Sequence, residues 1–95
     1  MLGAQNLIDI RLGMQQGLTR VIIETDQEVN YKIFNLSGPP RMIIDFTNLK
    51  VPPGFGPRHQ NQGLVRGIRY GQFNAQITRI VLDLTESSQI GRAHV

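Results

Sequence analysis

The sequence contains no cysteine and no tryptophan, and it has only 2 tyrosines among its 95 residues. Without cysteine the chain has no disulfide framework and no thiolate for catalysis or metal binding. No apolar run approaches the roughly 20 residues of a membrane-spanning helix, so we expect no membrane insertion. The opening residues MLGAQNLIDI lack the basic start and apolar stretch of a secretory signal peptide, as an excised piece of an exported protein also would.

Lysine is scarce as well, so arginine carries most of the positive charge. Lys32 and Lys50 are the only lysines, and 10 basic residues against 7 acidic ones give a net charge of +3 and a pI of about 10.0. This mild excess is compatible with an anionic partner, such as nucleic acid or a cell-wall polymer, but does not require one. A hydrophobic content of 40% and a charged content of 18% are typical of one globular domain with a modest core.

Residues that favour β-strands gather in short runs separated by Gly, Pro, Asn and Ser. No segment of helical length carries apolar residues at i, i+3 and i+4, so the sequence predicts an all-β fold. The predicted strands are Leu7–Leu12, Leu18–Thr25, Val29–Leu36, Arg41–Phe46, Leu64–Tyr70 and Ile77–Leu84. A loop rich in proline and glycine, Lys50–Gly63, separates the fourth strand from the fifth.

Two parts of the chain repeat one another. IRLG at Ile10–Gly13 matches IRYG at Ile68–Gly71, and LTRVIIE from Leu18 matches ITRIVLD from Ile77. The offset is 58 residues before the turn and 59 after it. We therefore predict a β-sandwich of two similar small sheets, in which two copies of one unit cover each other's apolar faces. The first copy contains two further strands after its repeated pair, but none is predicted after Leu84, so we expect the second copy to be truncated.

We assign residues 7–86 to one domain. It comprises a first repeat, a linker loop and a partial second repeat, at residues 7–46, 47–63 and 64–86. Residues 87–95 form a tail whose last six residues, IGRAHV, are what the common sequencing adapter ATC GGA AGA GCA CAC GTC encodes. We interpret residues 90–95 as non-native, with an ordinary polar tail as the alternative, and leave His94 out of the functional argument.

Three predicted strands share a finer pattern of arginine, three apolar residues and an acid: Arg20–Glu24, Arg41–Asp45 and Arg79–Asp83. Because side chains alternate across a strand, each arginine shares a face with its acid, and the opposite face belongs to the core. The predicted core residues are Val21, Ile23, Met42, Ile44, Ile80 and Leu82. Two such strands paired antiparallel in register would bring each arginine to its partner's acid. The structural cross-strand charges predicted on this basis are Glu24, Arg41, Asp45 and Asp83. An arginine-studded face for an anionic polymer is the alternative.

The sequence lacks the residues of a catalytic site. A catalytic zinc ion needs about three ligands from His, Asp, Glu or Cys, and a serine triad needs a positioned base. With His94 set aside, His59 is the one histidine, and it lies in the loop with no acid nearby. The loop also lacks the third glycine of a phosphate-binding loop, and Pro57 removes a backbone donor. We expect this chain to be non-catalytic, with no metal site and no cofactor of its own.

Two stretches, VNYKIFNLSGPPRMIIDF and GLVRGIRYGQFNAQITRIVLDL, resemble the AMIN domain, the non-catalytic module N-terminal to many periplasmic N-acetylmuramoyl-L-alanine amidases. The matching segments are Thr19–Glu24, Tyr31–Phe34, Pro39–Asp45 and Thr78–Asp83. The resemblance covers roughly Ile8–Leu84. Glu24 stands where the family more often has aspartate, a change that preserves the charge.

The resemblance implies a β-sandwich, a periplasmic location and binding to peptidoglycan, which would localise an attached amidase where cells separate. The parent enzyme would use zinc, held in a catalytic domain outside this chain, to cleave the amide between N-acetylmuramic acid and L-alanine. Peptidoglycan is the expected partner, and divisome proteins are further candidates. The same module occurs in type IV pilus secretins, where it anchors the assembly to the wall, and this is the alternative function.

The candidate peptidoglycan-binding residues are repeat-related arginines and nearby aromatic residues, because arginine suits anionic stem peptides and exposed rings suit sugars. They are Arg11, Arg20, Arg69, Tyr70, Phe73 and Arg79. A packing or ion-pairing role is the alternative for each, and Tyr31 is assigned to the core edge of its strand. A single-stranded nucleic-acid-binding barrel is a second alternative, since Tyr70 and Phe73 lie near Arg66 and Arg69. The balanced charges and the lack of tryptophan argue against it, so we expect no nucleic acid partner.

Overall fold

The computed structural model describes residues 5–56, 63–85 and 92–94 of the chain. Within these residues every regular element is a strand, so the prediction of an all-β fold is confirmed. The strands are β1 (Gln5–Gln15), β2 (Leu18–Thr25), β3 (Tyr31–Leu36), β4 (Arg41–Thr47), β5 (Leu49–Lys50), β6 (Val65–Gln72), β7 (Ile77–Leu84) and β8 (Arg92–His94).

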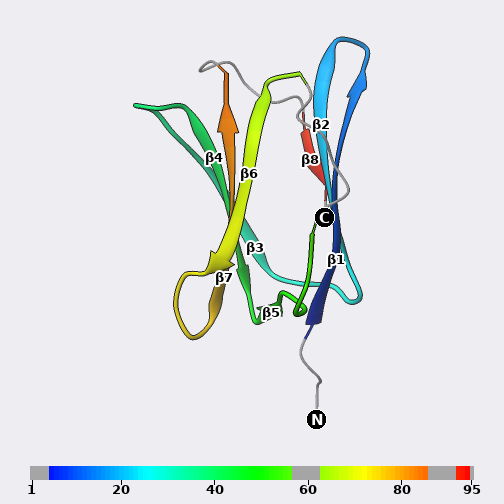
Figure 1. The fold of residues 1–95 in the computed structure, drawn as a ribbon, viewed down its shortest axis with the longest axis vertical. Helices are drawn as coiled ribbons and strands as arrows, with labels where there is room; N and C mark the ends of the chain where they lie inside the picture. The colour runs from blue at the N-terminus through cyan, green and yellow to red at the C-terminus, as the bar shows by residue number, and fades with distance from the viewer. Residues whose placement is uncertain (1–4, 57–62, 86–91, 95) are drawn as a thin grey trace.

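The strands form two sheets that face each other across one core (Figure 1). One sheet has the order β5-β1-β2-β8 and the other has the order β3-β4-β7-β6. All pairs are antiparallel except those of the short edge strands, because β5 runs parallel to β1 and β8 runs parallel to β2. The predicted β-sandwich of two similar sheets is therefore confirmed.

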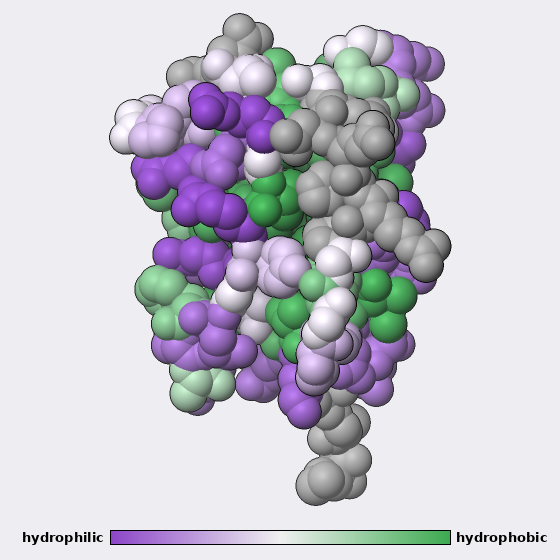
Figure 2. Space-filling view, in the orientation of Figure 1, coloured by the Kyte–Doolittle hydropathy of each residue, from purple (hydrophilic) through white to green (hydrophobic). Residues whose placement is uncertain are grey.

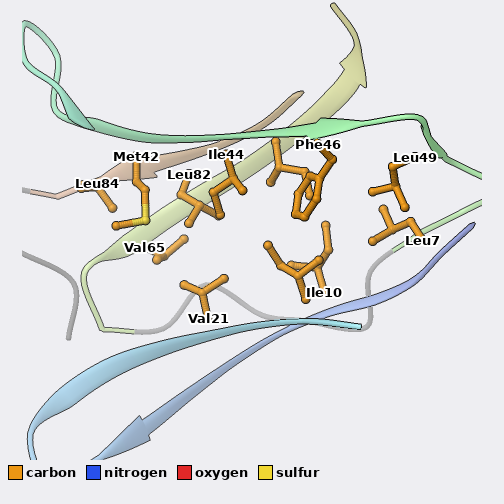
Figure 3. Packing of buried hydrophobic residues seen from close by; sticks show 12 residues of the cluster. Leu7, Ile10, Val21, Met42, Ile44, Phe46, Leu49, Val65, Leu82 and Leu84 are labelled. Atoms are coloured by element: carbon orange, nitrogen blue, oxygen red, sulfur yellow. The ribbon is translucent and has the colours of Figure 1, made fainter. Parts of the chain in front are cut away.

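The core lies between the sheets, and its side chains come from both (Figure 3). Along β7 buried and half-buried residues alternate without interruption, as expected for a strand with one face on the core. All six predicted core residues are buried, none more than 7% exposed. Phe46 is the largest fully buried side chain and lies where β4 faces Ile10 of the opposite sheet. Burying a side chain of this kind contributes about 1.5–3 kcal/mol, so the facing strands hold the sandwich together.

The repeat in the sequence is also a repeat of strand pairing. The β1–β2 hairpin has a register shift between Leu7 and Asp9, and the β6–β7 hairpin has one between Val65 and Gly67. From these shifts onward the pairs of one hairpin match those of the other, at an offset of 58 residues in the first strand and 59 in the second. A shift of this kind bends and twists a strand. Because both hairpins carry it at the equivalent position, they are copies of one backbone unit.

The one-residue change of offset arises in the turns. The β1–β2 turn consists of Gln16 and Gly17, whose φ values of 53° and 77° are typical of a two-residue type I′ turn. The β6–β7 turn is longer, at Asn74–Gln76, and is closed by a hydrogen bond of 2.8 Å from the Phe73 amide to the Ile77 carbonyl. The second copy therefore carries its additional residue in the turn, where it leaves the strand registers intact.

Two buried threonines occupy equivalent places in the hairpins. Thr19 is 2% exposed and Thr78 is 0% exposed. Thr78 Oγ1 donates a hydrogen bond of 2.5 Å to the Leu49 carbonyl, and Thr19 Oγ1 accepts one of 3.0 Å from the Leu64 amide. Buried polar groups need such partners. Each threonine therefore ties its hairpin to a segment outside it.

The two shortest strands were not predicted. β5 lies in the stretch assigned to the linker loop, and β8 follows Leu84, after which no strand was expected. Strands of two and three residues are too short for a periodic pattern, and their pairing depends on the neighbouring strands β1 and β2. Tyr31 is about half exposed at the start of β3, with its ring centroid 6.0 Å from that of Phe46, so it covers an edge of the core.

Candidate functional site

The outer face of the β3-β4-β7-β6 sheet combines charged and aromatic side chains. Alternation along β4 and β7 turns Ile43 and Val81 away from the core, and the two lie in register. Ile43 is nevertheless only 3% exposed, because Phe34 and Val81 flank it on the neighbouring strands. The residues around this pair form what we call the outer-face cluster: Phe34, Asp45, Arg69, Phe73, Arg79 and Asp83.

Arg79 lies at the centre of the outer-face cluster. Its Nε and Nη2 donate hydrogen bonds of 2.8 and 2.9 Å to the two carboxylate oxygens of Asp45, directly across from it on β4. These hydrogen bonds raise the pKa of the Arg79 guanidinium above its ordinary value. The guanidinium carbon lies 3.8 Å from the centroid of the Phe73 ring and 5.7 Å from that of Phe34. A bidentate carboxylate and two rings therefore fix the guanidinium in one plane.

Phe73 directly follows the last residue of β6 and is 56% exposed. Its position is set by the turn that follows, in which Asn74 Oδ1 accepts hydrogen bonds from the amides of Gln76 and Ile77 at 2.8 and 2.9 Å. Gly71 lies opposite Arg79, and a side chain at that position would enter open space. The result is a shallow depression of about 210 Å³ beside the phenyl ring, lined mainly by Arg69, Gly71, Phe73, Arg79 and Val81.

Arg69 makes the second bidentate pair of the cluster. Its Nε and Nη2 donate hydrogen bonds of 2.9 and 2.8 Å to Asp83 on β7, and these raise the pKa of the Arg69 guanidinium. The Arg69 side chain is 63% exposed. Arg41 faces Asp83 from the other side, but its Nε donates to the Pro39 carbonyl at 3.0 Å. The cluster thus presents two arginines in fixed positions, one shielded by Phe73 and one open to solvent.

A family model described as the AMIN domain matches residues 8–92. The chain belongs to the AMIN domain family. It is also 27% identical, over 85 residues, to the N-acetylmuramoyl-L-alanine amidase AmiC of Escherichia coli O6:H1. That alignment covers 85% of this chain and 20% of the amidase, so the chain spans about a fifth of the length of this curated relative.

The AMIN domain is a non-catalytic module, and the amidase is a longer protein that contains a similar stretch. Among the residues that the structure describes, no group of three or more His, Cys, Asp or Glu side chains is placed to hold a metal ion. The part of the chain at residues 5–56, 63–85 and 92–94 contains no helix that is long and apolar enough to cross a membrane. His59 lies outside the described residues, and so do the side chains of the last strand, His94 included.

The outer face of the other sheet of this AMIN domain has an equivalent but different arrangement. Arg11 Nη1 donates a hydrogen bond of 2.8 Å to Glu24 Oε1 and lies 3.6 Å from Asp9. Arg11 and Glu24 are the repeat counterparts of Arg69 and Asp83. Arg20, the counterpart of Arg79, donates to the side chain of Gln15. Gln15 occupies the position that Phe73 has in the second hairpin. The exposed Phe73 ring stacked on Arg79, which we call the aromatic shelf, therefore has no equivalent at this position of the other sheet.

The predicted binding residues are therefore divided between two surfaces. Arg69, Phe73 and Arg79 lie together in the outer-face cluster, whereas Arg11 lines a separate hollow of about 830 Å³ formed by one end of β2 and the segment that leads to β3. In Figure 2 hydrophilic residues (purple) cover the β6 side of the molecule, and apolar residues (green) show between the two sheets.

Tyr70 does not contribute its ring to the outer-face cluster. Its hydroxyl donates a hydrogen bond of 2.8 Å to the Phe55 carbonyl, and the two rings meet edge to face at 5.2 Å. Tyr70 therefore anchors the loop after β5 to the core. Adjacent residues of a strand point to opposite faces, so the sequence already placed Tyr70 and Arg69 apart. Sequence reasoning also missed Phe34, which the alternation of β3 places on the same outer face as Ile43 of β4.

Proposed function

We propose that this AMIN domain is the peptidoglycan-binding module of a periplasmic N-acetylmuramoyl-L-alanine amidase, and that it holds the wall polymer on the outer-face cluster. AMIN domains of amidases bind peptidoglycan in general, and the similarity to an amidase supports that parent over a secretin. On this proposal zinc and the hydrolytic chemistry belong to a catalytic domain elsewhere in the parent. The module would retain that domain on the wall at sites of cell separation, with divisome proteins as further partners.

The observation that carries the proposal is the exposed phenyl ring of Phe73, which stacks on the Arg79 guanidinium. Two hydrogen bonds to Asp45 hold that guanidinium in place. One face of the ring packs against the Arg79 guanidinium at 3.8 Å, and the ring as a residue remains 56% exposed. The C–H face of a sugar ring packs on an aromatic face through the same dispersion and apolar contact that operates between side chains. The shelf therefore suits the glycan strand.

The arginines beside the shelf suit the anionic parts of the polymer. Arg69 and Arg79 each use Nε and Nη2 for their carboxylate partners, which leaves the N–H groups of the other terminal nitrogen as donors. Carboxylates of a stem peptide or of muramic acid are strong acceptors for such donors. We propose that Phe73 supplies most of the affinity for sugar and that Arg69 and Arg79 select for the attached acid.

Co-sedimentation with purified peptidoglycan sacculi at low and high salt tests this assignment. We expect the protein to pellet with sacculi at both salt concentrations, because contact with an aromatic ring is not screened by ions. Phe73→Ala should weaken retention about tenfold, the loss expected for about 1.4 kcal/mol of contact energy. Gln15→Ala is the matched control, because Gln15 holds the equivalent position on the other sheet. Absence of pelleting at either salt concentration, or equal losses for both variants, would contradict the proposal.

A further inference from the structure

Gly71 occupies a position of β6 at which the fold does not require glycine. Its φ lies outside the left-handed region that favours glycine, and a Cβ built on it would meet no atom within 4 Å. It is exposed on the outer face of the sheet, in register with Arg79. A glycine inside a strand weakens the strand and often marks a place where a ligand comes close to the backbone. Since neither backbone conformation nor packing explains Gly71, a ligand is the remaining physical reason for it.

The backbone of Gly71 forms the floor of the depression in the outer-face cluster. Residues two apart on a strand share one face, so Arg69 lies on one side of Gly71, about 7 Å along the strand. Phe73 directly follows β6 on the other side, and its ring lies on the same face because it stacks on Arg79. The two walls of the depression therefore differ in chemistry, since one is an apolar ring and the other is a cation.

A sugar ring that lies over Gly71 can contact both walls at once. Phe73 is 56% exposed, so part of its ring remains available to the C–H groups of a sugar beside its contact with Arg79. The Arg69 side chain is 63% exposed and binds Asp83 through Nε and Nη2, which leaves the N–H groups of Nη1 as donors. The depression therefore suits a sugar that carries an oxygen acceptor on a short substituent of its ring.

From this geometry we infer that the depression over Gly71 is the subsite for the muramic acid residue of peptidoglycan, and that Gly71 is the specificity-determining residue that admits it. The inference rests on the proposed function, because it names the part of the polymer that the outer-face cluster holds. Of the two sugars in the glycan strand, N-acetylmuramic acid bears a lactyl group and N-acetylglucosamine does not. The sugar ring packs beside Phe73, and Nη1 of Arg69 donates to a lactyl oxygen, whether this belongs to a free carboxylate or to the amide that joins the stem peptide.

The first hairpin offers a matched position for testing Gly71. Gly13 is its repeat counterpart, lies in register with Arg20, and a Cβ there would also meet no atom within 4 Å. Gln15 stands where the second hairpin has Phe73, so a sugar over Gly13 would not meet a phenyl ring at that place. Substitutions at Gly13 and Gly71 therefore change their strands alike, but only those at Gly71 fill the depression.

Co-sedimentation of the 95-residue chain with peptidoglycan sacculi tests the inference through Gly71→Ala and Gly71→Val. Because added volume in an occupied site is unfavourable, we expect retention to weaken about threefold for Gly71→Ala and about tenfold or more for Gly71→Val. The urea midpoints of both variants should stay unchanged or rise, because each replaces a glycine inside a strand. Gly13→Ala and Gly13→Val are the controls and should leave retention unchanged.

Competition identifies the sugar. Soluble glycan strands freed of stem peptide still carry the lactyl carboxylate, and they should release the bound protein from sacculi. An N-acetylglucosamine oligomer of similar length should release much less, because it offers Arg69 no lactyl oxygen. Equal release by the two probes would overturn the assignment to muramic acid.

The remaining outcomes separate this inference from the proposed function. If the unsubstituted chain is retained and Gly71→Val is retained equally well, the inference fails while the proposed function stands. A lowered urea midpoint for Gly71→Val, with none for Gly13→Val, would also overturn the inference, because the glycine would then serve the fold. Absence of pelleting by the unsubstituted chain would overturn both.

Discussion

The β1–β2 and β6–β7 hairpins share one backbone plan and differ in what is attached to it. Their registers, including the shift near the start of the first strand, match pair by pair. In one hairpin an arginine of the second strand meets Gln15, and in the other the equivalent Arg79 stacks on Phe73 and binds Asp45 of β4. The comparison teaches that the duplicated backbone sets where side chains point, whereas the turn residue and the neighbouring strand decide what each face can bind.

The largest expected difference between the hairpins lies in the core. Leu82 and Ile23 are repeat counterparts, 0% and 1% exposed, but β7 has a full strand on each side whereas β2 is flanked by β1 and the short β8. Leu82→Ala should lower the free energy of unfolding by about 2–5 kcal/mol, because it leaves a cavity that well-packed neighbours cannot fill. Ile23→Ala should cost less within that range, because its strand relaxes more easily. Urea unfolding curves provide both values, and a larger loss for Ile23→Ala would contradict this account of the two sheets.

The next largest effect concerns the buried threonines. Thr78→Val removes the hydroxyl that donates to the Leu49 carbonyl and leaves a buried acceptor without its partner. We expect a loss of about 1–3 kcal/mol in the free energy of unfolding. Thr19→Val removes the acceptor of the Leu64 amide and should cost a similar amount, since Thr19 is equally buried. Thermal unfolding of both variants checks the equivalence, and a loss confined to one of them would show that the repeat is not symmetric in energy.

A smaller effect separates the two repeat-related arginines. Arg79→Lys loses the bidentate geometry with Asp45 and the flat stacking on Phe73, because an ammonium group provides neither. The Arg79 and Asp45 side chains are 29% and 15% exposed, so solvent screens their ion pair only in part. We therefore expect the free energy of unfolding to fall by about 1 kcal/mol. At the equivalent contact Arg20 meets Gln15, whose side-chain oxygen an ammonium group can also bind, so Arg20→Lys should lose less from this contact. Equal shifts of the urea midpoint for the two variants would remove the distinction between the faces.

The smallest effect is a pH dependence found at one hairpin only. Both hairpins close with the same backbone hydrogen bond, from Asp26 to Asn6 and from Thr85 to Leu64. Only the first adds a carboxylate, and the hydrogen bonds from the Asn6 amide and side chain lower the pKa of Asp26 below its ordinary 3.8.

Because the folded-state pKa of Asp26 is the lower one, its contribution to stability is complete above the unfolded value and disappears as the pH falls through the folded value. Asp26→Asn should therefore lower the urea midpoint slightly at neutral pH and leave it unchanged in strong acid. Thr85→Asn is the control and should shift the urea midpoint equally at neutral pH and in strong acid. An acid-sensitive loss in the control, or none in Asp26→Asn, would assign the pH dependence to other groups.

The sequence predicted the features that depend on local alternation. β2 and β7 begin and end at the predicted residues, and the core faces follow from residues two apart. Alternation alone also separates Tyr70 from Arg69, because adjacent side chains of β6 point to opposite faces of the sheet. What alternation cannot supply is the partner of each strand. The addition of β3 and β4 to β7, rather than to β2, places Asp45 beside Arg79 and Phe34 near it, and nothing in the spacing of these residues along the chain specifies that choice.

The most direct test of the difference between the two faces is an NMR titration of the 15N-labelled protein with soluble peptidoglycan fragments that contain both glycan and stem peptide. We predict shifts at the amides of Arg69 to Phe73 and at Arg79, with the equivalent amides of Arg11 to Gln15 and Arg20 unmoved. Equal shifts on both hairpins, or shifts on the β1–β2 hairpin alone, would contradict the claim that the stacked Phe73 and its fixed arginine make one face the binding surface.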